Sequence, residues 1–273
     1  MDKEYKQKYP EWTRDGKKYY MTMSDDLDSF FSCILLEKIL GYEITHYYDF
    51  DGLYQGDNYI HDGTILVGVD MDIVKSEYRV WGNHCTCSKN NLNAANINNI
   101  EKINLNNYTA KYAGSTLLQI ISYYNLDISM LSEEAMMILL AVDTTFKMYQ
   151  FNKNNCKYYL VDILELPELY ELCEEHSQEE FYDLIKKYNL HEKIYIENGM
   201  LETEIDLKSL EEIFNMPFIL PKNKFELIHT YENIGLHYDG YKRIKKQQEE
   251  NSEEVEETFD GHIKFENGSL SVE

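Results

Sequence analysis

The stretch KKYYMTMSDDLDSFFSCILLEKILG, residues 17–41, decides the fold class. Residues 17–23 predict a strand, which ends at the acidic cluster SDDLD of residues 24–28. From Ser29 onward, apolar residues recur at the spacing of a helix, and Gly41 is a natural helix end. A strand that leads through a short turn into a helix is the repeating unit of an α/β protein.

The segments that follow repeat this pattern. Residues 42–50, 64–69 and 77–81 predict further strands, and TILVGV at 64–69 is short, continuously apolar and β-branched, as is typical of a buried parallel strand. Helices are expected at about 112–124 and 133–144, the second with Ser132 as its N-cap. We therefore expect an open parallel sheet flanked by helices over residues 1–160.

The remaining residues predict a smaller C-terminal α+β region. Residues 161–240 are expected to be mainly helical, with a capping box from Ser177 to Glu180 and another helix at 206–214. Residues 241–273 read as a charged linker followed by a terminal hairpin. The hairpin is predicted by Asn267-Gly268, which separates two alternating segments.

Charge and composition restrict the partners. The chain of 273 residues is 43% hydrophobic, enough for a core, and its net charge is −23 with only three arginines. This field repels long duplex DNA, whereas a nucleotide, a short oligonucleotide or a basic protein remains compatible with it. Five cysteines without regular spacing, no apolar leader and no membrane-length apolar run predict a soluble cytoplasmic protein that does not contact membranes. The oligomeric state stays open.

Acidic residues and one histidine recur where predicted strands or helices end. Because the carboxyl ends of parallel strands meet at one edge of the sheet, these side chains are expected to converge on one crevice. Converging carboxylates repel one another unless a divalent cation neutralises them, and carboxylates with an imidazole suit Mn²⁺ or Mg²⁺. The residues concerned are Asp26, Asp28, Asp70, Asp72, His84 and Asp143.

In order and spacing, four short motifs within residues 17–150 resemble those of the DHH phosphoesterases. Asp26-Leu27-Asp28-Ser29 is similar to the first motif, D-x-D-[GAS], and Asp70 in VGVDMD is similar to the second, a strand-ending aspartate. Gly82-Asn83-His84 stands where the family has its DHH triplet. The fourth motif, an apolar stretch leading to Asp-Thr and an aromatic residue, is matched by LAVDTTF at residues 140–146, which contains Asp143.

The resemblance implies a centre of two Mn²⁺ or Mg²⁺ ions. Asp26, Asp70 and Asp143 would hold one ion, and Asp28, Asp70, Asp143 and the first histidine of the triplet would hold the other. Here Asn83 replaces that histidine, which leaves His84 to contact the scissile phosphate. A shift of one residue would instead make His84 the metal ligand. The family usually has a His or Asp shortly before D-x-D. Here the candidates are Thr22 or Ser24, neither of which readily replaces it, and Asp25 is the only strong ligand nearby.

Two functions follow from this pattern, and the sequence leaves both open. The first is a metal-dependent phosphoesterase that cuts short or single-stranded nucleic acid or a nucleotide, with His84 and Asn83 at the reacting phosphate. The second is a degenerate relative that binds a nucleotide, nucleic acid or a protein without turnover. The family's glycine-rich GGGH segment is missing, and the nearest basic cluster, with Lys242 and Arg243, is either a substrate clamp or a solvated patch.

Two weaker patterns remain. His84-Cys85-x-Cys87 suggests zinc, but no second pair has the spacing of zinc ligands. The asparagine-rich stretch at residues 90–107 is either a contact for nucleic acid or a polar loop. A P-loop motif does not occur, which argues against an ordinary P-loop nucleotide site.

Overall fold

The computed structural model describes residues 1–73, 77–86, 91–104 and 106–231, and three further strands in backbone only. A seven-stranded sheet has the order β6-β5-β4-β1-β2-β3-β9. The first five of these strands are parallel, whereas β3 and β9 run antiparallel to their neighbours. The α/β class with a mostly parallel sheet is therefore confirmed. The strands are β1 (Tyr20–Met23), β2 (Glu43–Tyr48), β3 (Gly52–Gly56), β4 (Leu66–Val69), β5 (Arg79–Trp81), β6 (Ala94–Ala95) and β9 (Phe225–Thr230).

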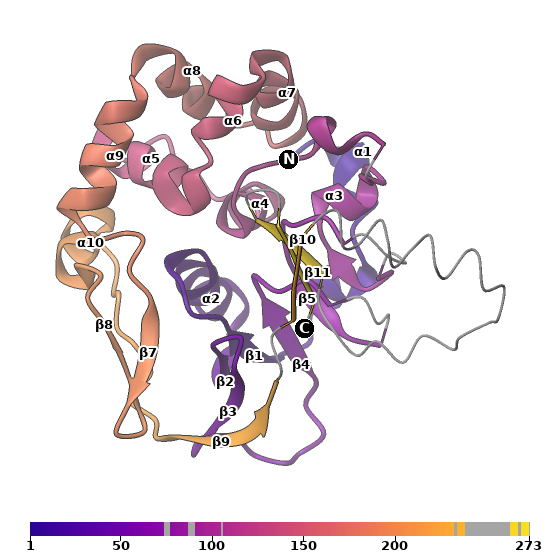
Figure 1. Ribbon diagram of the computed structural model, residues 1–273, viewed down its shortest axis with the longest axis vertical. Coiled ribbons are helices and arrows are strands. Elements are labelled where there is room, and N and C mark those ends of the chain that lie inside the picture. Colours follow the sequence, from indigo (N-terminus) through magenta and orange to yellow (C-terminus); the bar gives the residue numbers. More distant parts are fainter. Residues whose placement is uncertain are drawn as a thin grey trace, which may run out of the picture.

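Helices flank this sheet, and short 3-10 turns join several of them (Figure 1). Helix α2 packs against β1, β2 and β4 and against α4, while α5 packs against α8 and α9. The helices are α1 (Lys3–Lys6), α2 (Leu27–Leu40), α3 (Ile97–Ile100), α4 (Thr116–Tyr123), α5 (Glu133–Ala141), α6 (Lys147–Phe151), α7 (Lys153–Lys157), α8 (Pro167–Glu175), α9 (Gln178–Lys187) and α10 (Leu207–Phe214). No helix in the described ranges has both the length and the apolar character needed to cross a membrane.

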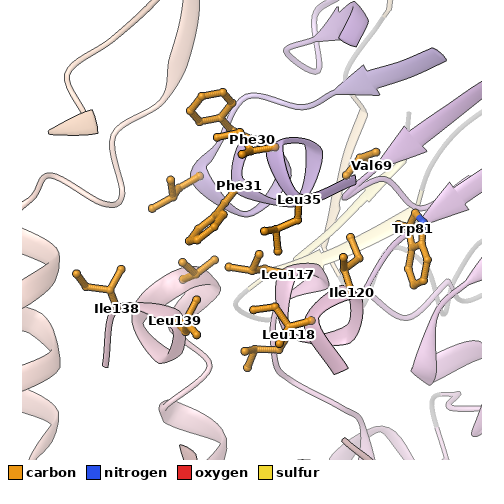
Figure 2. Packing of buried hydrophobic residues seen from close by; sticks show 14 of the residues in the cluster. Phe30, Phe31, Leu35, Val69, Trp81, Leu117, Leu118, Ile120, Ile138 and Leu139 are labelled. Carbon is orange, nitrogen blue, oxygen red and sulfur yellow. The ribbon is translucent and has the colours of Figure 1, made fainter. Parts of the chain in front are cut away.

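The core lies between the sheet and these helices. Figure 2 shows Phe31 and Leu35 of α2 directed toward Leu117 of α4, with Val69 and Trp81 coming from the strands. All five side chains are at most 8% exposed. Their burial removes apolar surface from water, the main favourable term in folding, and fixes α2 and α4 relative to the sheet edge. Any side chain at the N-terminal ends of these two helices is thereby held in place.

The predicted strands and the first helix are confirmed, with shorter bounds. Strand β1 begins at Tyr20 rather than at residue 17, and all four of its residues are buried. Helix α2 begins two residues before Ser29 because the Asp26 carboxylate caps it, accepting a hydrogen bond from the Ser29 amide at 3.2 Å. Gly41 ends the helix in the left-handed conformation, with φ of 66°.

Two predicted helix bounds are wrong, for local reasons. Helix α5 begins after Ser132 as expected but ends at Ala141, since Asp143 and Thr144 have φ of 49° and 51° and cannot continue it. Helix α4 begins only at Thr116. The preceding Tyr112 is held outside it because its amide donates to Asn98 Oδ1 at 2.8 Å.

The C-terminal region is less helical than predicted. The capping box of Ser177 and Glu180 is present at α9, and α10 follows Asp206. The sequence did not predict the hairpin of β7 (Ile194–Glu197) and β8 (Met200–Thr203), nor that β9 joins the main sheet. In the tail, β11 (Ile263–Glu266) pairs antiparallel with β12 (Ser269–Val272), which also pairs with β10 (Ile234–His237). The turn at 267–268 lies outside the described residues.

Replacing Gly41 with alanine is expected to lower the free energy of unfolding by about 1 kcal/mol, because a Cβ disfavours positive φ. Space is not the obstacle: the nearest atom to such a Cβ is the flexible Lys18 Cε at 3.4 Å. Urea unfolding measures the change. Gly41→Asn is the control, since asparagine tolerates this conformation better. Equal losses in both variants would contradict the conformational explanation.

Candidate functional site

The site lies beside β1, where the order of the strands in the sheet reverses. From β1 the chain passes through α2 to β2 on one side, whereas β4 lies on the other side of β1. Ser29 joins the ends of the two strands, because its hydroxyl donates to the Val69 carbonyl at 2.7 Å and accepts from the Ser24 amide at 2.7 Å. Ligands in open α/β sheets bind in this kind of crevice.

Asp28 is the most deeply buried of the predicted site residues, with 3% exposure. Its two oxygens accept hydrogen bonds from the first amides of α4, those of Thr116 and Leu117, each at 2.8 Å. Burial, and then the nearby carboxylates of Asp143 and Asp26, raise the pKa of Asp28 well above its ordinary value. Asp28 thus ties α2 to α4 at a place where its ionised form is disfavoured.

Two further aspartates, Asp70 and Asp143, accept hydrogen bonds from side chains near Asp28. The Thr116 hydroxyl donates to Asp70 Oδ1 at 2.9 Å, so Thr116 bridges Asp70 and Asp28. Asn83 Nδ2 donates to Asp143 Oδ2 at 2.7 Å and to the Gly114 carbonyl at 3.0 Å. These bonds fix the amide orientation, and they leave Asn83 Oδ1 buried with no hydrogen-bond partner among the described residues.

His84 follows a tight turn that Asp72 holds. Asp72 accepts from the His84 amide at 3.2 Å and from Asn96 Nδ2 at 2.7 Å, and it is 7% exposed. Gly82 is required here, since a Cβ would lie 2.5 Å from Asp72 Oδ1 and 2.6 Å from the Met71 carbonyl. Asp72 therefore supports the turn, while the half-buried His84 side chain lies at the cleft.

These residues border a cleft of about 690 Å³. One part of its lining is acidic or polar and comes from the predicted motifs: Asp26, Asp28, Asn83, His84 and Asp143. Another part is basic and comes from segments that the motifs do not include: Lys111, Lys147, His191 and Lys193. The lining of the cleft thus places three lysines and a histidine opposite three aspartates, in a protein whose net charge is −23.

Three of the basic side chains lie close together. Partial burial, followed by the charges of Lys147 and Lys193, lowers the pKa of His191 below its ordinary value. Lys193 Nζ lies 2.9 Å from Asp25 Oδ1 and 3.6 Å from Asp26 Oδ2. Lys147, His191 and Lys193 are called the basic cluster below.

Aromatic residues also line the cleft. Phe151 at the end of α6 is 72% exposed and borders the cleft. Tyr108 is half-buried, and its hydroxyl accepts a hydrogen bond from Lys111 Nζ at 2.9 Å. Asn155 Nδ2 donates to the Lys111 carbonyl at 2.8 Å, which ties this segment to α7.

The described side chains do not fit the two-ion centre that the resemblance implies. Within the described ranges, no three His, Cys, Asp or Glu side chains are grouped so as to hold a metal ion. Asp28 and Asp70 accept from donors on α4, Asp143 accepts from Asn83, and Asp26 caps α2. An amide replaces the imidazole at position 83, which removes a ligand that such ions commonly use.

The structure brings together most residues that the motifs identified and adds others. Asp26, Asp28, Asp143, Asn83 and His84 line one cleft, and Asp70 is linked to it through Thr116. The predicted substrate residues Lys242 and Arg243, and also Cys87, lie outside the described residues.

The asparagine-rich stretch serves the fold. Asn91, Asn96 and Asn98 are at most 2% exposed, and their side chains bridge backbone segments. The sequence motifs did not identify the basic cluster. Of its three residues, only Lys147 lies next to a motif, directly after LAVDTTF.

The repulsion between Asp28 and Asp143 predicts a pH effect. Since the folded-state pKa of Asp28 is raised, its contribution to stability is present at low pH and is lost as the pH rises through that pKa. Asp143→Asn should reduce this loss, so the variant gains stability over the wild type as the pH rises above about 4, the ordinary pKa of an aspartate. Urea unfolding across this range measures it. Asp183→Asn, on the exposed side of α9, should show no such gain; a gain that is equal in both variants would argue against local repulsion.

Comparison of the chain with family models, with curated proteins and with solved structures finds no match.

Proposed function

We propose that the cleft binds a nucleotide, or the end of a short single-stranded oligonucleotide, through a phosphate group and without turnover. The observation that carries the proposal is the basic cluster, Lys147, His191 and Lys193, assembled at a cleft in a strongly acidic chain. Like charges are costly to hold together unless an anion or carboxylates compensate them. Asp25 and Asp26 are the partners of Lys193, and a phosphate would compensate the charge of Lys147.

The rest of the cleft suits the other part of a nucleotide. Phe151 offers an exposed ring, and Tyr108 offers a second ring with a polar end. Stacking of a base on such a ring stabilises a complex by about 1–3 kcal/mol and tolerates any base. Asn83 Oδ1, which has no hydrogen-bond partner among the described residues, offers an acceptor near Asp143. A single phosphate site with aromatic walls favours a short ligand over duplex DNA.

Fluorescence anisotropy of a labelled single strand of about six nucleotides tests this proposal. The titration is made in buffer containing a chelator, and unlabelled nucleoside monophosphate and the matching nucleoside serve as competitors. We expect saturable binding, displacement by the nucleotide and little displacement by the nucleoside. An absence of binding, or equal competition by the two compounds, would refute phosphate recognition.

Metal-dependent hydrolysis of phosphodiesters is the second candidate, as the resemblance implies. Its support is that Thr116 links Asp28 to Asp70 and that the charge of Asp143 acts on Asp28, since neighbouring carboxylates are typical of sites that take cations. Release of nucleotides from labelled RNA, single-stranded DNA and cyclic dinucleotides in Mn²⁺ or Mg²⁺ tests it. The Asn83→His variant, which restores a histidine at the triplet, is the matched comparison. Turnover by the wild type would replace the binding proposal with this one.

A further inference from the structure

Lys193 is held against the acidic cluster by contacts on several sides. Its ammonium lies 2.9 Å from Asp25 Oδ1 and 3.6 Å from Asp26 Oδ2. Its carbonyl accepts a hydrogen bond from the Thr203 hydroxyl at 2.9 Å. The next amide, that of Ile194, donates to the Asp25 carbonyl at 2.7 Å, and the Ile194 carbonyl accepts from the Tyr47 hydroxyl.

These anchors join distant parts of the chain. Asp25 and Asp26 follow β1, whereas Lys193 precedes β7 by one residue. The side chains of Asp25 and Asp26 are 13% and 31% exposed, so they are partly withdrawn from water, where a nearby positive charge matters more than at an open surface. These hydrogen bonds fix the backbone of Lys193 and Ile194 beside Asp25, so the fold brings the lysine side chain to the acidic segment.

We infer that the Lys193 ammonium is a built-in counter-cation and takes the place of a divalent metal ion at Asp25 and Asp26. The inference goes beyond the proposed function, because it concerns what neutralises the acidic segment whichever ligand the cleft takes. Phosphate binding in this cleft is therefore independent of metal.

The test is a gain of metal binding. Mn²⁺ alone is titrated into the wild type and into Lys193→Met, with the melting temperature and the electron paramagnetic resonance signal of the ion as readouts. We expect the wild type to show no stabilisation by Mn²⁺ at the cleft. Removal of the competing charge should raise the affinity of the variant for Mn²⁺ at least about tenfold.

Two variants control for charge and folding. Lys193→Arg keeps the positive charge and should behave as the wild type. Lys187→Met removes the same charge from an exposed pair with Glu134, 2.7 Å away, and should gain no Mn²⁺ affinity. If Lys193→Met does not fold, Lys193→Gln takes its place, and the wild type alone still tests the first expectation.

Two outcomes would overturn the inference: cooperative Mn²⁺ stabilisation of the wild type, or an affinity for Mn²⁺ that is the same in the wild type and in Lys193→Met. The proposed function is tested separately, by measuring nucleotide binding to the wild type in buffer that contains a chelator. An absence of nucleotide binding by the wild type, together with a gain of Mn²⁺ binding in Lys193→Met, would leave the inference intact and reject only the ligand.

Discussion

Replacing Asp28 with alanine is expected to lower the free energy of unfolding by about 3 kcal/mol. The substitution leaves the amides of Thr116 and Leu117 without their acceptor at a buried helix start, and each such group costs about 1–3 kcal/mol. Loss of repulsion with Asp143 offsets a smaller part of this. Chemical denaturation at neutral pH measures the difference.

Asp26→Ala is the matched control from the same motif. Asp26 caps α2 through the Ser29 amide and is half-buried, so its loss is expected to cost only about 1 kcal/mol. A similar small cost for both variants would mean that Asp28 has little structural role, and its carboxylate would then be better explained as a ligand. The expected contrast distinguishes an aspartate that joins two helices from one that begins a helix.

Replacing Lys147 with alanine is expected to weaken binding of the labelled oligonucleotide about 10–100-fold, because a hydrogen bond to a charged group contributes about 1.5–3 kcal/mol. Lys147 belongs to the basic cluster and lines the cleft. The exposed position of Lys147 predicts little change in stability. The anisotropy titration measures affinity, and repetition at several salt concentrations should give a shallower salt dependence for the variant.

Lys153→Ala controls for net charge. Lys153 lies on α7 with its ammonium 4.6 Å from the centre of the Tyr149 ring, and it does not line the cleft. Its loss should leave affinity within about twofold of the wild type, since its ammonium lies against the Tyr149 ring and not in the lining of the cleft. If both variants weaken binding equally, the ligand responds to overall charge, and the basic cluster is not its site.

Local sequence determined the elements near the site. The apolar run before Asp70 and the tyrosine-rich run before Asp26 form adjacent parallel strands, because buried β-branched and aromatic residues fit a sheet covered on its face. The caps at Ser132 and Ser177 were predicted, since each involves residues within three positions of one another. The acidic residues meet beside β1 because the strand order reverses there, with β2 on one side and β4 on the other.

Helix ends and edge strands were less predictable. The apolar sequence pattern of α5 extends beyond Ala141, where the helix ends. The helix does not continue because Asp143 has a positive φ, and the Asp143 carboxylate accepts a hydrogen bond from Asn83. Strand β9 has one buried residue, Phe225, and exposed residues at its other five positions, so its sequence lacks the alternation that marks a half-buried strand. It becomes a strand because β3 offers it backbone partners.

The sequence by itself determined a strand–helix scaffold and the acidic residues at its edge, because hydrophobic period and capping act between neighbours in the chain. Only the tertiary structure decided what surrounds those residues. The Lys193 ammonium reaches Asp25 across 168 positions, and the α4 amides reach Asp28 across 88 and 89. Contacts between residues so far apart in the chain depend on how the helices pack on the sheet, and no local sequence pattern predicts them.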